Sequence, residues 1–228
     1  MQIQAVLFDL DNTLTHRDQS VQAYSRHLVK HYQHNIQANA LDTVIAIVRR
    51  IDNGGYPQAE QLTHPSIAAS VAYALQQELN WHQTPELDEL TEFWFSHFGD
   101  FAVAMQGAER LLQQLKQAGF KLGIISNGGH KTRLNILQGL GFLDYFDVVH
   151  SSELVGIRKP QSEIFIHTAA ELAVLPEQCL FVGDHPINDI QGAQSAGMKA
   201  ILIEGFHDIP EDLNVAKITQ LHEVWQHL

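Results

Sequence analysis

Short apolar runs rich in β-branched residues alternate along the chain with segments of helical periodicity. Such uninterrupted runs are typical of strands that are buried on both faces of a parallel sheet. They span residues 3–8, 121–125, 147–150, 180–182 and 199–203. The helical patterns between them span residues 108–118, 133–140, 165–172 and 187–196. Strands that alternate with helices predict an α/β fold with a Rossmann-like, mostly parallel sheet.

Two of these helical patterns carry a face of regularly spaced leucines, which predicts the side that packs on the sheet. The leucines are Leu111, Leu112 and Leu115 in the first pattern, and Leu134, Leu137 and Leu140 in the second. The tail over residues 206–228 carries Pro210 and predicts only a short closing helix.

One long stretch, residues 16–98, interrupts the alternation, because it carries no strand-like run. Four amphipathic helical patterns fill it instead, separated by turn signals such as Asn53-Gly54-Gly55 and Thr84-Pro85. The patterns span residues 19–34, 39–52, 66–80 and 86–98. The sequence therefore predicts an α/β core formed by residues 1–15 and 99–228, with a helical domain inserted at 16–98.

Composition and charge narrow the class of protein. The 228 residues are 45% hydrophobic and carry a formal net charge of -12, which makes nucleic acids and anionic membranes poor partners. The single cysteine, Cys179, cannot form an internal disulfide, and the start of the chain lacks the pattern of a signal peptide. No apolar stretch approaches the roughly 18 residues of a membrane span. A cytoplasmic location follows by default. We also expect a monomer or homodimer whose partner is a small molecule.

Polar residues follow the predicted strands at the points where each ends, which is where open parallel sheets bind ligands. Asp9 and Asp11 follow the first strand, so one carboxylate could attack while the other transfers a proton. Ser126 and Asn127 end the second strand, where a hydroxyl and turn N–H groups could hold a phosphoryl oxygen. These types of residue point to phosphoryl transfer.

Cationic and metal-binding groups complete the pattern. Lys159 lies in a turn before a helix, where its ammonium could neutralise developing negative charge. Asp184 and Asp189 follow the fourth strand, and their carboxylates suit a hard cation such as Mg²⁺.

The four segments together resemble the haloacid dehalogenase-like hydrolase superfamily (HAD), over nearly the whole chain and in the family's motif order. The resemblance implies a HAD-like fold with a helical cap and an Mg²⁺-dependent phosphatase that acts on small phosphate monoesters. It implies that Asp9 attacks phosphorus and becomes an aspartyl phosphate, and that Asp11 protonates the leaving alcohol. The family often has Gly where this chain has Asn12, and Asn tolerates left-handed backbone better than most residues.

The resemblance also assigns the remaining residues. It implies that Asp9, Asp184 and the backbone carbonyl of Asp11 bind Mg²⁺. Ser126, with Asn127 beside it, and Lys159 would hold the substrate's phosphoryl group. Asp189 would support the site by orienting Lys159 or a metal-bound water.

Other functions remain open at this point. A sugar-phosphate mutase of the same superfamily would share these motifs. A haloacid dehalogenase is less favoured, because halide needs no proton to leave and that branch lacks a carboxylate at position 11. A non-enzymatic phospho-acceptor module would be shorter and would lack the helical insertion. A P-loop kinase is disfavoured because Lys131 follows Gly128 too late for the motif.

Overall fold

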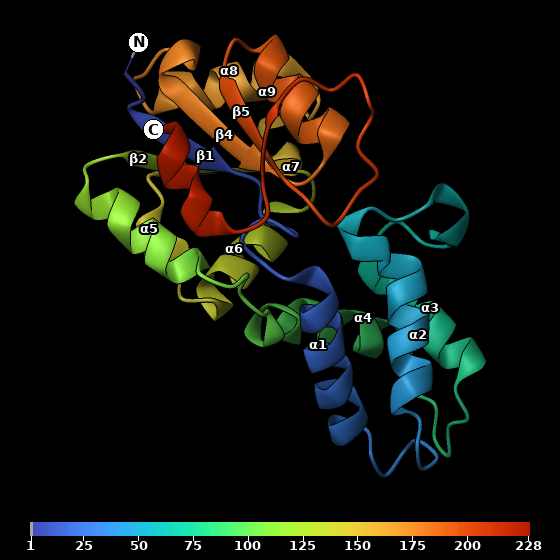
Figure 1. The fold of residues 1–228 in the computed structure, drawn as a ribbon. Helices are drawn as coiled ribbons and strands as arrows, with labels where there is room; N and C mark the ends of the chain where they lie inside the picture. Colours follow the sequence, from blue (N-terminus) through green and yellow to red (C-terminus); the bar gives the residue numbers. More distant parts are fainter. Residues whose placement is uncertain (1) are drawn as a thin grey trace. The chain divides into compact units, whose positions relative to one another are not determined.

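The structure, a computed structural model, describes residues 2–228 (Figure 1). Within them the chain forms two compact units. One comprises the described residues up to Thr15 together with Ala104–Leu228, and the other is His16–Val103. We call them the α/β unit and the helical unit. Among the described residues, no helix is both long enough and apolar enough to cross a membrane.

A parallel sheet forms the centre of the α/β unit. Among the described residues it has six strands in the order β3-β2-β1-β4-β5-β6, and each neighbouring pair is parallel. The strands are β1 (Ala5–Phe8), β2 (Lys121–Ser126), β3 (Val148–Ser151), β4 (Cys179–Gly183), β5 (Lys199–Ile203) and β6 (Ala216–Ile218). The predicted α/β class and its parallel sheet are confirmed, because each of the five predicted apolar runs overlaps one strand of the sheet.

The sixth strand was not predicted from the sequence. β6 has three residues, Ala-Lys-Ile, and pairs with β5 through Ile201, Leu202 and Ile203. A segment this short has too few positions to show a strand periodicity. It lies inside the tail from which only a closing helix was expected, and that tail does end in a 3₁₀ helix at Leu221–His227.

Helices cover both faces of this sheet (Figure 1). They are α5 (Ala108–Gln117), α6 (His130–Gly139), α7 (Ser152–Val155), α8 (Ser162–Glu171) and α9 (Gly192–Ser195), with shorter 3₁₀ turns at Leu143–Tyr145 and Pro176–Gln178. The leucine face of α5 is buried as predicted. The face predicted for α6 is partly wrong: Leu137 is buried, but Arg133 and Ile136 take the places expected for Leu134 and Leu140.

The helix predicted over 187–196 also differs in kind. It begins as a π-helix at Pro186–Gln191 and continues as α9. His185 caps its start, because its Nδ1 accepts hydrogen bonds from the N–H groups of Ile187 and Asn188. Wide helical turns of this kind are frequent at functional sites.

The core of the α/β unit follows from the alternation of side chains along β1. Ala5 and Leu7 pack with Phe165 of α8 and Ala193 of α9 in one apolar cluster. Because successive strand residues point to opposite faces, Val6 and Phe8 are directed to the other face, and both are fully buried. The free Cys179 belongs to the same cluster as Leu7, which confirms the prediction that it is a small core residue.

The helical unit is built from α1 (Arg17–His31), α2 (Leu41–Asp52), α3 (Ile67–Glu78) and α4 (Leu87–His97), with 3₁₀ turns at Asn53–Gly55, Ala59–Gln61 and Gly99–Phe101. Its described residues include an isolated bridge between Ile36 and Trp81 and no strand. An aromatic cluster fills its interior, where Tyr24 contacts the rings of Trp94 and Phe98. Whether this unit acts as a cap stays a prediction.

Candidate active site

The strand order identifies where a ligand would bind. The chain moves outward from β1 through β2 to β3, then crosses back to β4 on the other side of β1. Ligands of open α/β sheets bind where the order reverses, outside the carboxyl ends of the strands. Asp9 follows β1 and Asp184 follows β4, so the two carboxylates lie at adjacent strand ends on either side of this switch point.

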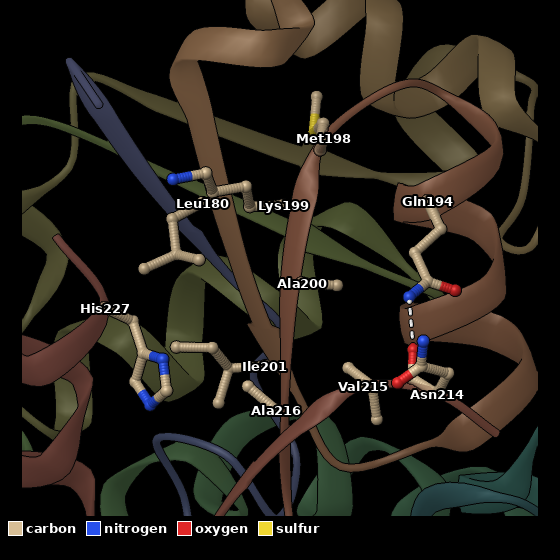
Figure 2. Close-up of a pocket in the computed structure, with 10 residues that line it drawn as sticks. All are labelled: Leu180, Gln194, Met198, Lys199, Ala200, Ile201, Asn214, Val215, Ala216 and His227. Carbon is tan, nitrogen blue, oxygen red and sulfur yellow. Dashed lines mark hydrogen bonds between the residues drawn. The ribbon is translucent and has the colours of Figure 1, made fainter. Parts of the chain in front are cut away.

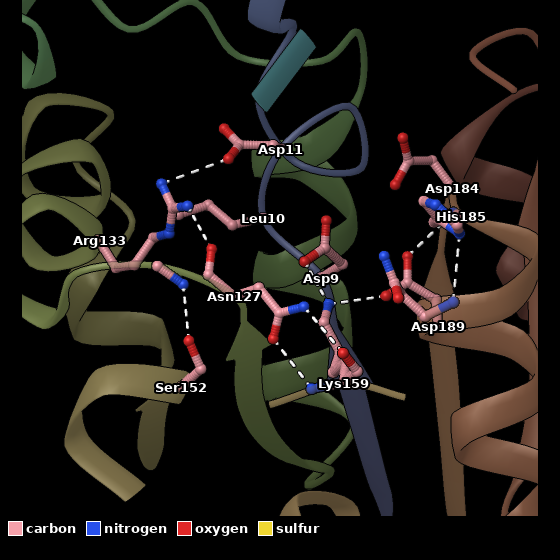
Figure 3. A network of polar contacts seen from close by, with 12 residues as sticks. Asp9, Leu10, Asp11, Asn127, Arg133, Ser152, Lys159, Asp184, His185 and Asp189 are labelled. Carbon is pink, nitrogen blue, oxygen red and sulfur yellow. Dashed lines mark hydrogen bonds and ion pairs between the residues drawn. The ribbon is translucent and has the colours of Figure 1, made fainter. Parts of the chain in front are cut away.

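A buried lysine links two of the predicted carboxylates (Figure 3). Lys159 Nζ lies 2.5 Å from Asp9 Oδ1 and 2.7 Å from Asp189 Oδ1. Carboxylate oxygens of Asp9, Asp184 and Asp189 also lie within 4.8 Å of one another. All four side chains are buried. Residues far apart in the sequence therefore meet at one edge of the sheet.

The local backbone explains how Asp189 reaches this position. A side chain at position 183 would collide with the carboxyl group of Asp189, so only glycine lets Asp189 fold back onto the end of β4. Asp189 Oδ2 accepts a hydrogen bond of 3.0 Å from the N–H of His185, while its Oδ1 faces Lys159. Both oxygens are thus engaged, and Asp189 supports Lys159 and the turn.

Burial and like charge act together on these groups. Burial raises the pKa of Asp9 well above its ordinary value; Lys159 opposes the shift and the neighbouring carboxylates add to it. Burial also raises the pKa of Asp184, to about 6. Burial alone would lower the pKa of Lys159, but the carboxylates of Asp189 and Asp9 outweigh it and raise that pKa. The lysine is therefore charged, and the cluster holds more negative than positive charge.

This charge imbalance fits a divalent cation. Asp9 Oδ2 is buried and has no hydrogen-bond partner among the described residues. A buried carboxylate oxygen left in this state is costly, and hard cations prefer such oxygen ligands. Asp9 and Asp184 follow the adjacent strands β1 and β4 and are the side chains best placed to bind the ion, while Asp189 is ion-paired with Lys159 and accepts a hydrogen bond from the N–H of His185.

Asp11 lies in the loop after β1 and is held apart from the lysine cluster. Its Oδ2 is 3.3 Å from Arg133 Nη1, and its Oδ1 accepts a hydrogen bond of 3.4 Å from the hydroxyl of Thr15. The loop turns at Asn12, which has a φ of 57° in the left-handed region, as its residue type allows. The structure therefore separates the two motif carboxylates into different electrostatic surroundings.

The second motif is arranged differently from the expectation for Asn127. The register pairs Phe8 with Ile124. Ser126 therefore ends β2, the strand that neighbours β1, and Asp9 directly follows β1. The amide of Asn127 instead bonds the backbone of Lys159: its Nδ2 donates to the carbonyl at 3.0 Å, and its Oδ1 accepts from the N–H at 2.9 Å. Its side chain thus fixes the lysine in place, and substrate binding by Asn127 stays a prediction.

Two residues of the site were not singled out in the sequence. Arg133 is buried on α6, where it contacts Asp11 and donates to the carbonyl of Asn127 at 2.5 Å. His207 follows β5, and its Nε2 lies 3.2 Å from Asp184 Oδ2. His207 could have been found from the sequence, because it follows the carboxyl end of the fifth predicted strand, where ligand-binding residues are expected. Arg133 gave no such signal, because its contacts arise only when α6 packs beside the first motif.

A separate hollow of about 480 Å³ lies elsewhere in the α/β unit (Figure 2). It is lined by the first residues of β5, by β6 and by α9, and Gln194 Nε2 donates across it to the carbonyl of Asn214 at 3.1 Å. The amino-terminal halves of the strands border it, so it is distinct from the carboxyl-end site. The residues that line it carry no carboxylate.

Comparison with known proteins identifies the family. The sequence model for haloacid dehalogenase-like hydrolases matches residues 3–197. The chain belongs to this family. Its fold is also that of a HAD hydrolase from Bacillus subtilis, YfnB, determined bound to magnesium: the TM-score is 0.73 at 21% identity, covering 100% of this chain and 99% of that one. The resemblance inferred from the four motifs is confirmed.

Curated HAD relatives match part of the chain. It is 37% identical over 122 residues to haloacid dehalogenase-like hydrolase domain-containing protein 3 from Mus musculus, covering 54% of this chain and 47% of that protein. It is 41% identical over 92 residues to glyceraldehyde 3-phosphate phosphatase from Methanopyrus kandleri, covering 40% of each. The matched region thus spans less than half the length of these two relatives.

Proposed function

We propose that this HAD hydrolase is a phosphatase that cleaves small phosphate monoesters, with Asp9 as the nucleophile and Mg²⁺ as its cofactor. The arrangement around Asp9 carries the proposal. One of its oxygens is anchored by the buried Lys159, and the other is buried without a hydrogen-bond partner among the described residues. The match to a relative named as a phosphatase supports the same reaction class.

The reaction would proceed in two balanced steps. A carboxylate oxygen of Asp9 forms a bond to phosphorus while the ester P–O bond breaks, and Asp11 gives its proton to the departing alkoxide. Water then attacks the phosphorus of the aspartyl phosphate, Asp11 takes the proton from this water, and the Asp9–phosphate bond breaks. The products are an alcohol and inorganic phosphate, and both aspartates return to their starting states.

The other residues would stabilise the charge that gathers on the phosphoryl oxygens. Lys159 is fixed by Asp9, Asp189 and the amide of Asn127, so its ammonium needs no reorganisation during the reaction. Ser126 would donate its hydroxyl to a phosphoryl oxygen from the next strand end. Asp9, Asp184 and the backbone carbonyl of Asp11 would bind Mg²⁺, which supplies positive charge that a buried carboxylate needs to approach an anionic phosphate.

The experiment is phosphate release from a panel of phosphorylated sugars, nucleoside monophosphates and short phosphorylated metabolites, in the presence of Mg²⁺. We expect turnover of at least one ester, and a loss of roughly 10³-fold or more in kcat for Asp9→Asn, as when other catalytic nucleophiles are removed. Acid quenching of the wild type during turnover should trap phosphate bound to the protein. The exposed Asp144→Asn is the matched control and should leave kcat unchanged.

The outcomes separate the alternatives. No phosphate release from any ester, or an Asp9→Asn variant that keeps most of its activity, would contradict the proposal. An isomerised sugar phosphate without phosphate release would indicate a mutase. Halide release from 2-haloacids would indicate a dehalogenase, and a phosphorylated protein that persists for hours would indicate a phospho-acceptor module.

A further inference from the structure

A second group of potential metal ligands lies away from the four motifs, on the edge strand β3 and on α8. A ring nitrogen of His150, one of His167 and a carboxylate oxygen of Glu171 all lie within 4.8 Å of one another. His150 is buried, with 4% of its surface exposed, while His167 and Glu171 are exposed. None of the three belongs to the candidate active site.

The hydrogen bonds of Thr168 fix the tautomer of His150. The hydroxyl of Thr168 donates to the carbonyl of Ile164 at 2.7 Å, so its single hydrogen is already used. His150 Nδ1 lies 2.9 Å from the same hydroxyl oxygen. That ring nitrogen must therefore carry the hydrogen and donate it. His150 Nε2 is then the atom left to accept a proton or bind a metal ion.

This Nε2 atom faces a carboxylate. It lies 3.1 Å from Glu171 Oε2. A lone pair and a carboxylate oxygen repel each other at this distance, so the contact is favourable only with a cation between them, either a proton on the ring or a metal ion.

We propose that His150, His167 and Glu171 form a second metal site, which binds a divalent transition-metal ion of the zinc type. Tetrahedral zinc with bonds of about 2.0–2.1 Å places neighbouring ligand atoms roughly 3.3 Å apart, close to the separation of His150 Nε2 and Glu171 Oε2. A water would complete the coordination.

The helix supplies the other two ligands with suitable spacing. His167 and Glu171 are four residues apart on α8 and share a face. The rings of His150 and His167 are stacked, with centroids 4.9 Å apart. The exposed His167 ring would therefore have to turn in order to direct a nitrogen at the ion. Exposed side chains reorient at little cost. The buried His150 is already oriented by Thr168, in the way that residues hydrogen-bonded to a metal ligand usually orient it.

The ligand types discriminate between metals. Two imidazoles and one carboxylate suit zinc and its neighbours, whereas Mg²⁺ prefers oxygen ligands alone. The two sites of this chain should therefore bind different ions, with Mg²⁺ bound by the aspartates. Zinc would also tie the edge strand β3 to α8 and so stabilise the unit, because an ion that binds only the folded state raises its stability.

The test is titration of metal-free protein with Zn²⁺ by calorimetry, with Mg²⁺ kept in large excess to saturate the aspartate site. We expect one zinc ion to bind per chain. His167→Ala and Glu171→Gln should each weaken this binding by about 10–100-fold or more, and Thr168→Val by about 10–100-fold, as for other outer-sphere partners. Co²⁺ bound at the same site should show the intense visible absorption of a tetrahedral N/O complex.

Two matched controls make the result specific. Glu163→Gln alters an exposed carboxylate on the same helix, and His222→Ala alters an exposed histidine of the same unit. Both should keep wild-type zinc affinity. No zinc binding by the folded wild type under excess Mg²⁺, or equal affinity in the Glu171→Gln and Glu163→Gln variants, would overturn the proposal. Phosphatase activity is measured separately, so failure of one proposal leaves the other distinguishable.

Discussion

Two partners that the sequence did not reveal, Thr15 and Arg133, hold the carboxylate of Asp11. Each approaches a different oxygen, and the guanidinium of Arg133 also donates to the carbonyl of Asn127. A side chain at position 128 would collide with that guanidinium, and Gly128 has a φ of 140° that favours glycine. Arg133 therefore connects the first motif to the second and sets the direction of the Asp11 carboxylate.

Replacing Arg133 should impair proton transfer selectively. Arg133→Met removes the contact to Asp11 but keeps most of the buried volume, so kcat should fall by about 10-fold or more for alkyl phosphates. Aryl phosphates with good leaving groups should be affected less, because they depart with little help from an acid. The measurement is kcat for both ester classes, with the exposed Arg110→Met as control. Equal losses for both classes would argue for a purely structural role.

Residues of the site that follow strands could be predicted from the sequence, and a residue that comes from a helix could not. Asp9, Ser126 and Asp184 occupy strand ends, and a parallel sheet brings strand ends to one edge whatever the details of packing. Arg133 reaches the same region from inside a helix, so its position depends on how α6 packs. A sequence pattern carries no information on that contact, and the helix was expected to present Leu134 and Leu140 instead.

At the scale of elements, strands that are buried on both faces could be recognised from the sequence, whereas the short edge strand β6 could not. β1 and β4 are fully buried along their length, so each appears as an unbroken apolar run. β6 lies at the edge of the sheet and has a lysine at its centre. Its pairing with β5 stabilises it, which is a tertiary effect that local pattern cannot reveal.

The helices α1 and α2 are joined by two ion pairs that differ in burial. Arg17 and Asp52 are almost fully buried and are held at 2.6 Å between Nη2 and Oδ1, whereas Arg49 and Asp18 are about half exposed. Buried and exposed pairs of the same chemistry, between the same two helices, form a natural comparison. The buried pair should matter far more when it is broken, because one charge is then left without compensation.

Asp52→Ala should therefore destabilise the helical unit by about 3–5 kcal/mol, the usual cost of breaking a buried pair. Asp18→Ala should cost only about 0.2–1 kcal/mol, since its pair with Arg49 is solvated. Denaturant unfolding followed by tryptophan fluorescence measures both, and Trp225→Phe confines the signal to Trp81 and Trp94 of this unit. Similar losses in the two variants would contradict the assignment of Arg17–Asp52 as a structural pair.

Across the whole molecule, negative charge dominates at two levels. The chain has a formal net charge of -12, and the candidate site adds a local cluster of buried carboxylates around one lysine. Both disfavour an anionic macromolecule as partner, and a small phosphate ester would approach only with a cation already bound. The expected absence of nucleic-acid and membrane partners, the cytoplasmic location and the monomeric or homodimeric state stay predictions.

If Mg²⁺ binds the same cluster as proposed, the stability of the α/β unit should depend on the metal. Buried carboxylates that repel one another destabilise the metal-free fold, and an ion that binds them only in the folded state offsets that cost. At about 100 times its Kd, Mg²⁺ should raise the Tm of the wild type by about 5–10 °C. Differential scanning calorimetry of the metal-free and Mg²⁺-saturated protein measures this shift.

Asp9→Asn separates this effect from general salt stabilisation. The substitution removes one buried negative charge, while Lys159 keeps Asp189 as its partner at 2.7 Å. The metal-free variant should therefore melt above the metal-free wild type, and Mg²⁺ should raise its Tm by a smaller increment. Asp144→Asn, which alters an exposed carboxylate of the same unit, should keep the wild-type increment.

If Mg²⁺ raised the Tm of Asp9→Asn and the wild type equally, the ion would be binding elsewhere than at Asp9. The gain in stability would thus accompany the loss of the nucleophile, because the charges that strain the folded state are the charges the reaction uses.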